Sequence, residues 1–404
     1  MSHPLAPAET KWTPLYFLAS LGLGGLAVSF FMYLMFWVSH PGQPVPVFED
    51  IARAFATGGL PMQAMIILAM AGIAVFVVLH YVSLIGNLRK YLAFRNTPAY
   101  EALRSSNAET QLMAVPLALA MAINGGFVAG LVFVPQLRSV VEYLFPLAIV
   151  AFIAVGWYAF SIMGDFFGRV FVKGGFDCSK NNSFAQLLPS FTFGMIGVGL
   201  AAPASLSLAP TTVAISYIAS TLFIAASLML LVAQAILGLR AMLENGTADE
   251  GAPTLWVIIP IMTVIGIALI RQAHGMHTSF EMHSEKTGIF TLFTWLGSIQ
   301  VLIFLLGWRV LSGKRYFARY VFGQERSAAS YALVCPFVAM SVLGHFFINK
   351  GLVQAGVLDK YSMAFWTLSG IPIMPQLLAV WLVFKLNSIH YGAPATQERI
   401  IAAE

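Results

Sequence analysis

Ten long stretches of apolar residues run through the chain, and they restrict its fold more than any other feature. A helix that crosses the hydrocarbon core of a bilayer needs roughly 20 mostly apolar residues. The stretches are continuous rather than alternating, which argues against membrane-spanning strands. The sequence therefore predicts one all-α integral membrane domain over residues 1–404. Its ten spans are expected at about 14–39, 61–90, 111–135, 140–168, 184–204, 209–241, 254–275, 287–311, 328–350 and 361–390.

The composition excludes several other classes of protein. Of the 404 residues, 59% are hydrophobic and only 10% are charged, whereas about a quarter of a soluble domain is charged. A soluble enzyme, a disordered chain and a disulfide scaffold are therefore excluded. The two cysteines, Cys178 and Cys335, are expected to be free thiols. There is no P-loop, GxSxG or HExxH motif, so we expect neither an enzyme nor a cofactor.

Basic residues predict the orientation. If the N-terminus is cytoplasmic, sixteen Lys and Arg residues fall on the cytoplasmic side and six fall outside. This asymmetry satisfies the positive-inside rule. With ten spans, both termini are cytoplasmic, and the protein is expected in a bacterial-type inner membrane. The net charge of +5 then reflects cytoplasmic loops, and no nucleic-acid partner is expected.

Prolines near the start of four odd-numbered spans indicate an internal repeat. Pro116, Pro189, Pro260 and Pro336 are 73, 71 and 76 residues apart. The repeating unit would be one helical hairpin, present five times. Proline inside a helix frees a carbonyl group, which must then face protein or a water-filled cavity. We therefore expect odd helices around a central pore and even helices in an outer ring.

A simpler interpretation of these residues stays open. Glycine and proline are common in membrane helices generally. The even-numbered spans four and ten also carry prolines, at Pro146, Pro372 and Pro375. The regular spacing of the other four prolines favours the repeat.

Short motifs in spans five, seven and nine resemble the tellurite-resistance/dicarboxylate transporter family. That family includes TehA-like proteins and slow anion channels. The motifs are Pro189-Ser190 followed by Gly194, Gly197 and Gly199; Pro260; and Tyr331-Ala-Leu-Val-Cys335-Pro336 followed by Ser341-Val342. The resemblance implies ten helices as five hairpins, a pore in each protomer and a homotrimer. It also implies passage of a small anion, which would be an inorganic anion, a sulfur oxyanion or a C4-dicarboxylate.

One position departs from this family. Its members usually carry a phenylalanine just before the proline of span nine, where the ring closes the pore. This chain has Cys335 there, and in this respect it is similar to the divergent TsoY-like branch, whose members can carry cysteine or selenocysteine. Two alternatives stay open: Phe193 or Phe337 fills the space instead, or the pore is gated differently.

The function expected from these features is a membrane channel or a facilitative transporter for a small anion. Its partners would be the lipid bilayer, small anions and further copies of the chain. Hydroxyl groups, aromatic rings and proline-associated backbone are expected to form the pore and its gate. These residues are Cys335, Pro336, Phe337, Phe193, Pro189, Ser190, Pro116, Asn124, Pro260, Thr263 and Ser341.

Two basic residues at the outer ends of spans seven and nine have two interpretations. Arg271 and Lys350 either form an electropositive outer mouth or reach to the membrane interface. At the inner end of span four, Asp165 and Arg169 are one turn apart. We expect these two to form an ion pair with each other.

The histidines support an alternative function, a membrane redox protein that holds haem or a metal. His80 and His345 lie within spans and are possible haem ligands. His274, His277 and His283 lie near two methionines and are weak candidates for a soft metal. The favoured interpretation is a polar loop that binds no metal.

Overall fold

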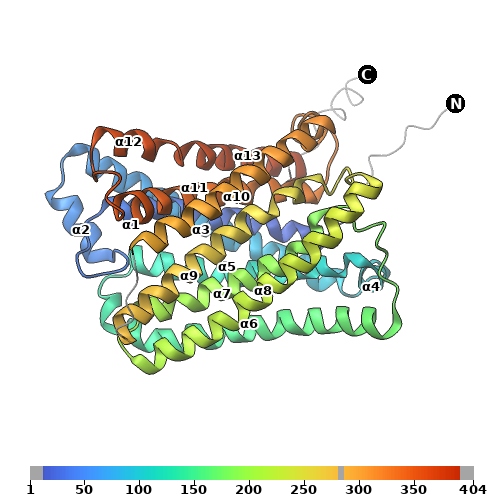
Figure 1. Cartoon of the computed structure of the whole chain (residues 1–404), viewed down its shortest axis with the longest axis horizontal. Helices are drawn as coiled ribbons and strands as arrows, with labels where there is room; N and C mark the ends of the chain where they lie inside the picture. Colours follow the sequence, from blue (N-terminus) through green and yellow to red (C-terminus); the bar gives the residue numbers. More distant parts are fainter. Residues whose placement is uncertain (1–11, 281–285, 392–404) are drawn as a thin grey trace, which may run out of the picture.

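The computed structural model describes residues 12–280 and 286–391, except for the side chains of residues 286 and 287, and all regular structure within those ranges is helical. Ten of its helical segments are long and apolar enough to cross a membrane, so this is a multi-pass membrane protein (Figure 1). In chain order the elements are η1 (Pro14–Tyr16), α1 (Phe17–Trp37), α2 (Phe48–Thr57), α3 (Leu60–Phe94), α4 (Pro98–Arg104), η2 (Asn107–Met113), α5 (Ala114–Phe133), α6 (Leu137–Lys173), η3 (Phe184–Leu187), α7 (Leu188–Leu206), α8 (Pro210–Asn245), η4 (Ala252–Val257), α9 (Ile258–Phe280), α10 (Lys286–Gly313), η5 (Phe317–Val321), η6 (Ala328–Leu333), α11 (Val334–Phe346), η7 (Phe347–Val353), α12 (Met363–Gly370) and α13 (Ile373–Tyr391).

The spans fall into two groups by burial. In the odd-numbered spans, built on α1, α5, α7, α9 and α11, between 56% and 94% of the most apolar window is buried within the protein. In the even-numbered spans, built on α3, α6, α8, α10 and α12–α13, the share is between 17% and 33%. The exposed surface of the even-numbered spans is rich in Leu, Ile, Val and Trp, as expected for helices that face lipid.

The five buried spans contact one another in a closed order. Helix α1 packs against α5, α5 against α7, α7 against α9, α9 against α11, and α11 again against α1. Each buried helix also contacts the exposed helix that follows it in the chain. The most buried helices of the molecule are therefore these five, which are drawn from the whole length of the sequence.

Each buried span begins with a short 3₁₀ helix that continues into an α-helix. The four repeated prolines lie in the second or third residue of the α-helix that follows, and all four are buried. Proline is well tolerated in a first turn, because no intrahelical partner for its missing N–H is required there. Each proline lies near the start of its span, as expected, but a first-turn proline need not free a carbonyl group inside the helix. The four prolines mark where the α-helices begin.

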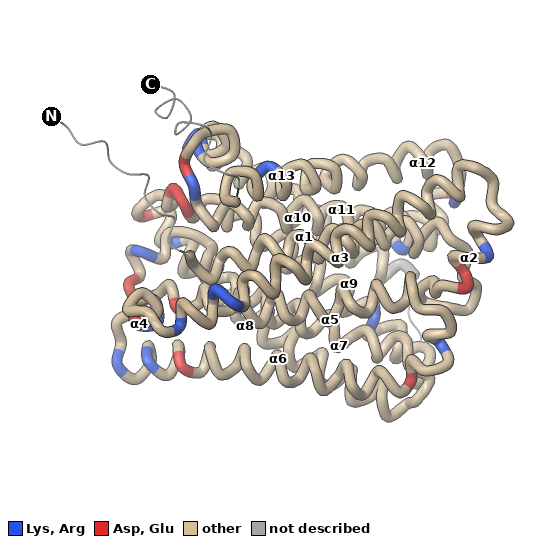
Figure 2. Tube along the Cα trace, turned by 180° about the vertical axis from the view of Figure 1, so that it is seen from behind, with Lys and Arg blue, Asp and Glu red and all other residues tan. Residues whose placement is uncertain are grey.

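Most charged residues lie towards the two ends of the helix bundle, as Figure 2 shows. We call these the α4 end and the α2 end. At the α4 end the buried Glu109 accepts hydrogen bonds from Arg104 and Arg169, and Arg104 also pairs with Asp165. Asp165 and Arg169 therefore pair with other residues instead of with each other.

A second ion cluster at the α4 end joins two loops. Asp249 pairs with Lys314 at 2.7 Å and with Arg319 at 2.8 Å, and Arg319 also pairs with Glu325 at 2.8 Å. The cluster connects the loop before η4 to the segment that follows α10.

The tenth span is not one continuous helix. A turn at Ile371 and Pro372 separates α12 from α13. Gly344 of α11 lies against this turn, where a Cβ atom would come within 3.0 Å of the Pro372 side chain.

Candidate functional site

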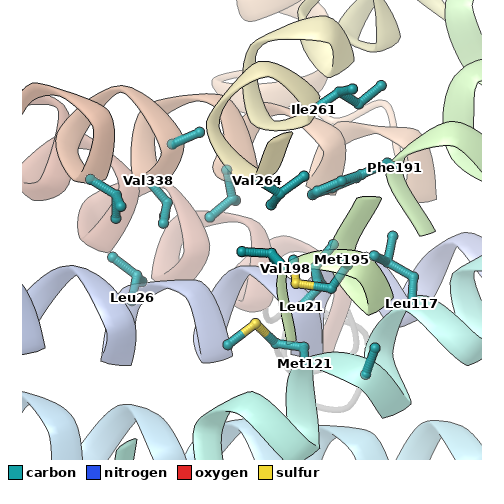
Figure 3. Packing of buried hydrophobic residues seen from close by; sticks show 14 of the residues in the cluster. Leu21, Leu26, Leu117, Met121, Phe191, Met195, Val198, Ile261, Val264 and Val338 are labelled. Atoms are coloured by element: carbon teal, nitrogen blue, oxygen red, sulfur yellow. The ribbon is translucent and has the colours of Figure 1, made fainter. Parts of the chain in front are cut away.

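A cavity of about 160 Å³ lies between the five buried helices. All five contribute to its wall, together with Val45 and two residues of α6. Figure 3 shows Leu21, Met121, Met195 and Val198 from α1, α5 and α7 close together, with Val264 of α9 nearby. The wall is almost entirely apolar, so the few polar groups in it are the candidates for contact with a polar ligand.

Arg271 is the only charged residue among the described residues that line this central cavity. It follows Pro260, Thr263, Val264 and Ile267 along one stripe of α9, at the spacing of a single helical face. Its Nη1 donates to the carbonyl oxygen of Val198 at 2.9 Å. No carboxylate lies within 4.0 Å of it in the described ranges. A guanidinium has five N–H donors, and this bond uses one of them. The Arg271 guanidinium can therefore donate further hydrogen bonds to a ligand in the cavity.

A smaller cavity of about 30 Å³ lies on the α4 side of the central one. Three residues line both cavities: Phe191 of α7, Pro260 of α9 and Cys335 of α11. Phe191 is 3% exposed. These three side chains form the partition between the two spaces.

Four of the predicted pore residues line the central cavity: Cys335, Pro260, Asn124 and Thr263. The Asn124 amide donates to the carbonyl oxygen of Ala120 at 3.1 Å. The Thr263 hydroxyl donates to the carbonyl oxygen of Ala339 at 3.1 Å and accepts from Gln300 at 2.7 Å. Thr263 therefore also ties α9 to α10 and α11.

Neither phenylalanine proposed as a replacement gate faces the central cavity. The Phe193 ring packs against Phe160 of α6 and Phe223 of α8, with centroids 4.7 and 6.0 Å away. Phe337 lines a separate apolar cavity of about 450 Å³, which also involves Phe304 and Phe347. Each ring is turned towards the outer helices, because its position is on the opposite side of its own helix. The gate role expected for these two residues does not fit this geometry.

The other predicted pore residues are buried between helices. Ser190 and Ser227 each donate to the carbonyl oxygen of the other, at 2.8 and 2.7 Å, which joins α7 to α8. Ser341 is fully buried with no hydrogen-bond partner in the described part of the chain. Pro116, Pro189 and Pro336 are buried and lie outside the cavity wall. Lys350 lies in η7 and also outside that wall.

Within the described ranges, the histidines do not come together as a metal or haem site. Among the described residues, no three His, Cys, Asp or Glu side chains form a group that could hold a metal ion, and His283 lies outside the described ranges. His80 donates from Nδ1 to the carbonyl oxygen of Ser20 at 2.7 Å, whereas His345 contacts the Tyr33 ring. Ser20 and Tyr33 are about 20 Å apart along α1, so His80 and His345 cannot ligate one haem.

Sequence reasoning missed the location of Arg271 inside the wall and the role of Phe191 in the partition. The helical period would have identified which side chains face the cavity. On α7 the wall residues Phe191, Met195, Val198 and Ala202 follow the spacing of one face, and Phe193 is off that face.

Comparison with known protein families and with curated proteins finds no match to this chain.

Proposed function

We propose that the protein is a channel or facilitative transporter through which a small anion crosses the membrane by way of the central cavity. The observation that carries this proposal is Arg271, a cation without a carboxylate partner in the described ranges, in the wall of a mostly apolar cavity. A charge in a low-dielectric space interacts with an opposite charge far more strongly than in water. An anion that enters would partly replace its lost hydration with guanidinium N–H donors.

The size of the cavity favours small substrates. Its volume is about 160 Å³, and a single water molecule needs at least ~10–15 Å³ of such space. An inorganic anion or a sulfur oxyanion fits together with several water molecules. A C4-dicarboxylate would need a second cation, and Arg271 is the only charged residue of the described wall. We therefore favour a monovalent or small inorganic anion among the three classes.

The partition between the two cavities is the proposed gate. Phe191 supplies the bulk of this partition, and Cys335 contributes a small side chain where a larger residue would narrow the passage further. Hydrophobic constrictions close a pore by excluding water. Motion of the Phe191 ring would connect the two spaces.

We also propose that the chain is a divergent member of the tellurite-resistance/dicarboxylate transporter family, arranged as five hairpins around its pore. The closed order of the five buried helices supports this. A homotrimer in a bacterial-type inner membrane, without catalytic activity or cofactor, completes the proposal. Light scattering of the purified protein measures the oligomer.

Anion flux into proteoliposomes tests the function. Wild-type protein should pass chloride or nitrate down a gradient, and Arg271→Gln should reduce this flux by roughly tenfold or more, since losing about 1.4 kcal/mol of stabilisation is a tenfold effect. Arg138→Gln is the matched control, because Arg138 is an exposed arginine outside the cavity wall. Equal flux in wild type and Arg271→Gln, or no flux in wild type, would disprove the proposal.

A further inference from the structure

A buried polar cluster lies between α1, α11 and α13 towards the α2 end, away from the central cavity wall. We call it the His345 cluster, and it consists of Tyr33, Trp37, His345, Asn349 and Gln376. The Tyr33 and Trp37 rings stack at 4.8 Å, and each meets the His345 ring edge-on at 5.7 and 5.8 Å. The Tyr33 hydroxyl donates to Oε1 of Gln376.

Five polar atoms of this cluster have no hydrogen-bond partner in the described ranges. They are both ring nitrogens of His345, Nε1 of Trp37, Nε2 of Gln376 and Oδ1 of Asn349. His345 and Gln376 are fully buried, and Trp37 and Asn349 are 7% exposed. Buried polar groups in proteins are almost always paired with protein or with ordered water, and leaving one unpaired is strongly unfavourable. The side chains that carry these atoms contact one another or lie one helical turn apart, and so many unpaired atoms among them indicate a polar ligand.

The backbone beside the cluster is also unusual. Immediately after His345 and Phe346, α11 changes to the π-helix η7, a form that is rare and frequently found at functional sites. The Asn349 amide donates to the carbonyl oxygen of His345 at 2.9 Å, which stabilises the widened turn. This bond uses the Nδ2 of Asn349 and leaves its Oδ1 available as an acceptor.

We propose that the His345 cluster is a binding site for water molecules inside the membrane-spanning region. Trp37, Gln376 and one nitrogen of His345 offer donors, while Asn349 and the other nitrogen of neutral His345 offer acceptors. An anion would meet the two acceptors unfavourably, whereas water can serve both kinds of group. A buried water makes about three hydrogen bonds, so five unpaired atoms require more than one water molecule.

Bound water would join helices that make no direct polar contact at these atoms. Trp37 belongs to α1, His345 to α11 and Gln376 to α13. Water bridges can be nearly as favourable as direct hydrogen bonds and allow small shifts of their partners. This inference does not depend on the proposed anion path.

Hydroxyl-radical footprinting by X-ray radiolysis tests the proposal on the wild-type protein in detergent. Radicals formed from bound water should modify Trp37 several-fold faster than Trp256. Trp256 is a matched control, because it is fully buried and its Nε1 already donates to the carbonyl oxygen of Phe304 at 3.0 Å. Equal protection of the two tryptophans would overturn the proposal.

The His345→Leu variant provides a second test, in which a dry site and a hydrated site predict opposite changes in the melting temperature. In a dry site the substitution removes two unpaired polar atoms and should raise the melting temperature. In a hydrated site the substitution removes hydrogen-bond partners of the bound water and leaves the Trp37 N–H without a partner, so the melting temperature should fall. The rate of Trp37 modification should also fall, because less water is bound beside the ring. A higher melting temperature, or an unchanged rate of Trp37 modification, would contradict the proposed site.

Discussion

Phe191 and Phe193 are two positions apart on α7 and have different surroundings. Phe191 lies at the partition between the two cavities. Phe193 packs against Phe160 and Phe223 of the outer helices. Two residues correspond to about 200° around a helix, so one ring faces inward and the other outward. The two side chains are chemically identical. Their direction decides that Phe191 lies at the partition and that Phe193 packs against the outer helices.

Replacing each phenylalanine with alanine separates a gate from a packing residue. Phe191→Ala should raise anion flux in proteoliposomes several-fold, because the partition loses its bulky side chain. Phe193→Ala should leave the flux per folded protein unchanged and lower the free energy of unfolding by about 3–5 kcal/mol, as expected for a buried phenylalanine. Flux and thermal stability are measured on both variants. An equal rise in flux for both would contradict the assignment of the gate to Phe191.

Single side chains were predictable from sequence where residue type and a nearby motif were sufficient, and not where the direction around the helix decides their surroundings. Asn124, Pro260, Thr263 and Cys335 were expected near the pore, and they line the cavity. Phe193 was chosen because it is aromatic and near Pro189, but those properties say nothing about its direction. Arg271 was expected either at an outer mouth or at the membrane interface, whereas an internal cavity provides another environment for it.

At the scale of helices, close approach between α7 and α9 depends on one glycine. A Cβ atom on Gly275 of α9 would come within 2.0 Å of the carbonyl oxygen of Ala204 in α7. Backbone atoms cannot move aside as a flexible side chain can. Both helices contribute wall residues to the central cavity, so their separation affects its shape.

Gly275→Ala should therefore destabilise the protein. Forcing the two helices apart should cost about 1–3 kcal/mol, the range typical of overpacking, and should lower the melting temperature. Gly297→Ala in α10 is the control, because nothing lies within 4 Å of its added Cβ. That control should be neutral or slightly stabilising, since alanine favours helix more than glycine does. A melting temperature unchanged by Gly275→Ala would contradict the close approach.

The Asp249 cluster makes stability depend on pH. Hydrogen bonds from Lys314 and Arg319 lower the pKa of Asp249 from 3.8 to about 2. A carboxylate whose pKa is depressed in the folded state contributes stability at pH values above its unfolded-state pKa. That contribution disappears as the pH falls through the folded-state pKa.

The wild-type melting temperature should exceed that of Asp249→Asn at pH 6, and the difference should shrink between about pH 4 and pH 2. Asp359→Asn, an exposed loop aspartate with no ion pair in the described ranges, should show no such convergence. A difference that stays constant with pH would contradict this role for Asp249.

At the scale of the whole molecule, the expectation of ten membrane-spanning helices is confirmed by their length and apolar character. Continuous apolar stretches are a strong signal, because every turn of such a helix must tolerate lipid or protein. The arrangement as hairpins around a pore stays a prediction. The break between α12 and α13 was not predicted, because Pro372 and Pro375 lie in a stretch that is apolar throughout.

The orientation in the membrane can be tested with the native cysteine of a loop at the α4 end. Cys178 is exposed, and the asymmetry of basic residues predicts that it is cytoplasmic. A membrane-impermeant thiol reagent should label Cys178 only after the cells are permeabilised. A cysteine introduced at Gly42, in the loop between α1 and α2, should be labelled in intact cells. The reverse pattern would show the opposite orientation.

Contact between α1 and α11 has a consequence for how the protein is made. The glycine face of α1 is covered by α11, with Val334 so close to Gly22 that a Cβ atom there would lie 2.8 Å from it. Residues 38–333 separate these two helices, and ribosomes add about 5–20 residues per second. The first helix must therefore wait in the membrane for on the order of tens of seconds before its final neighbour is synthesised. During that time, lipid or an insertion factor must shield the glycine face that α11 later covers.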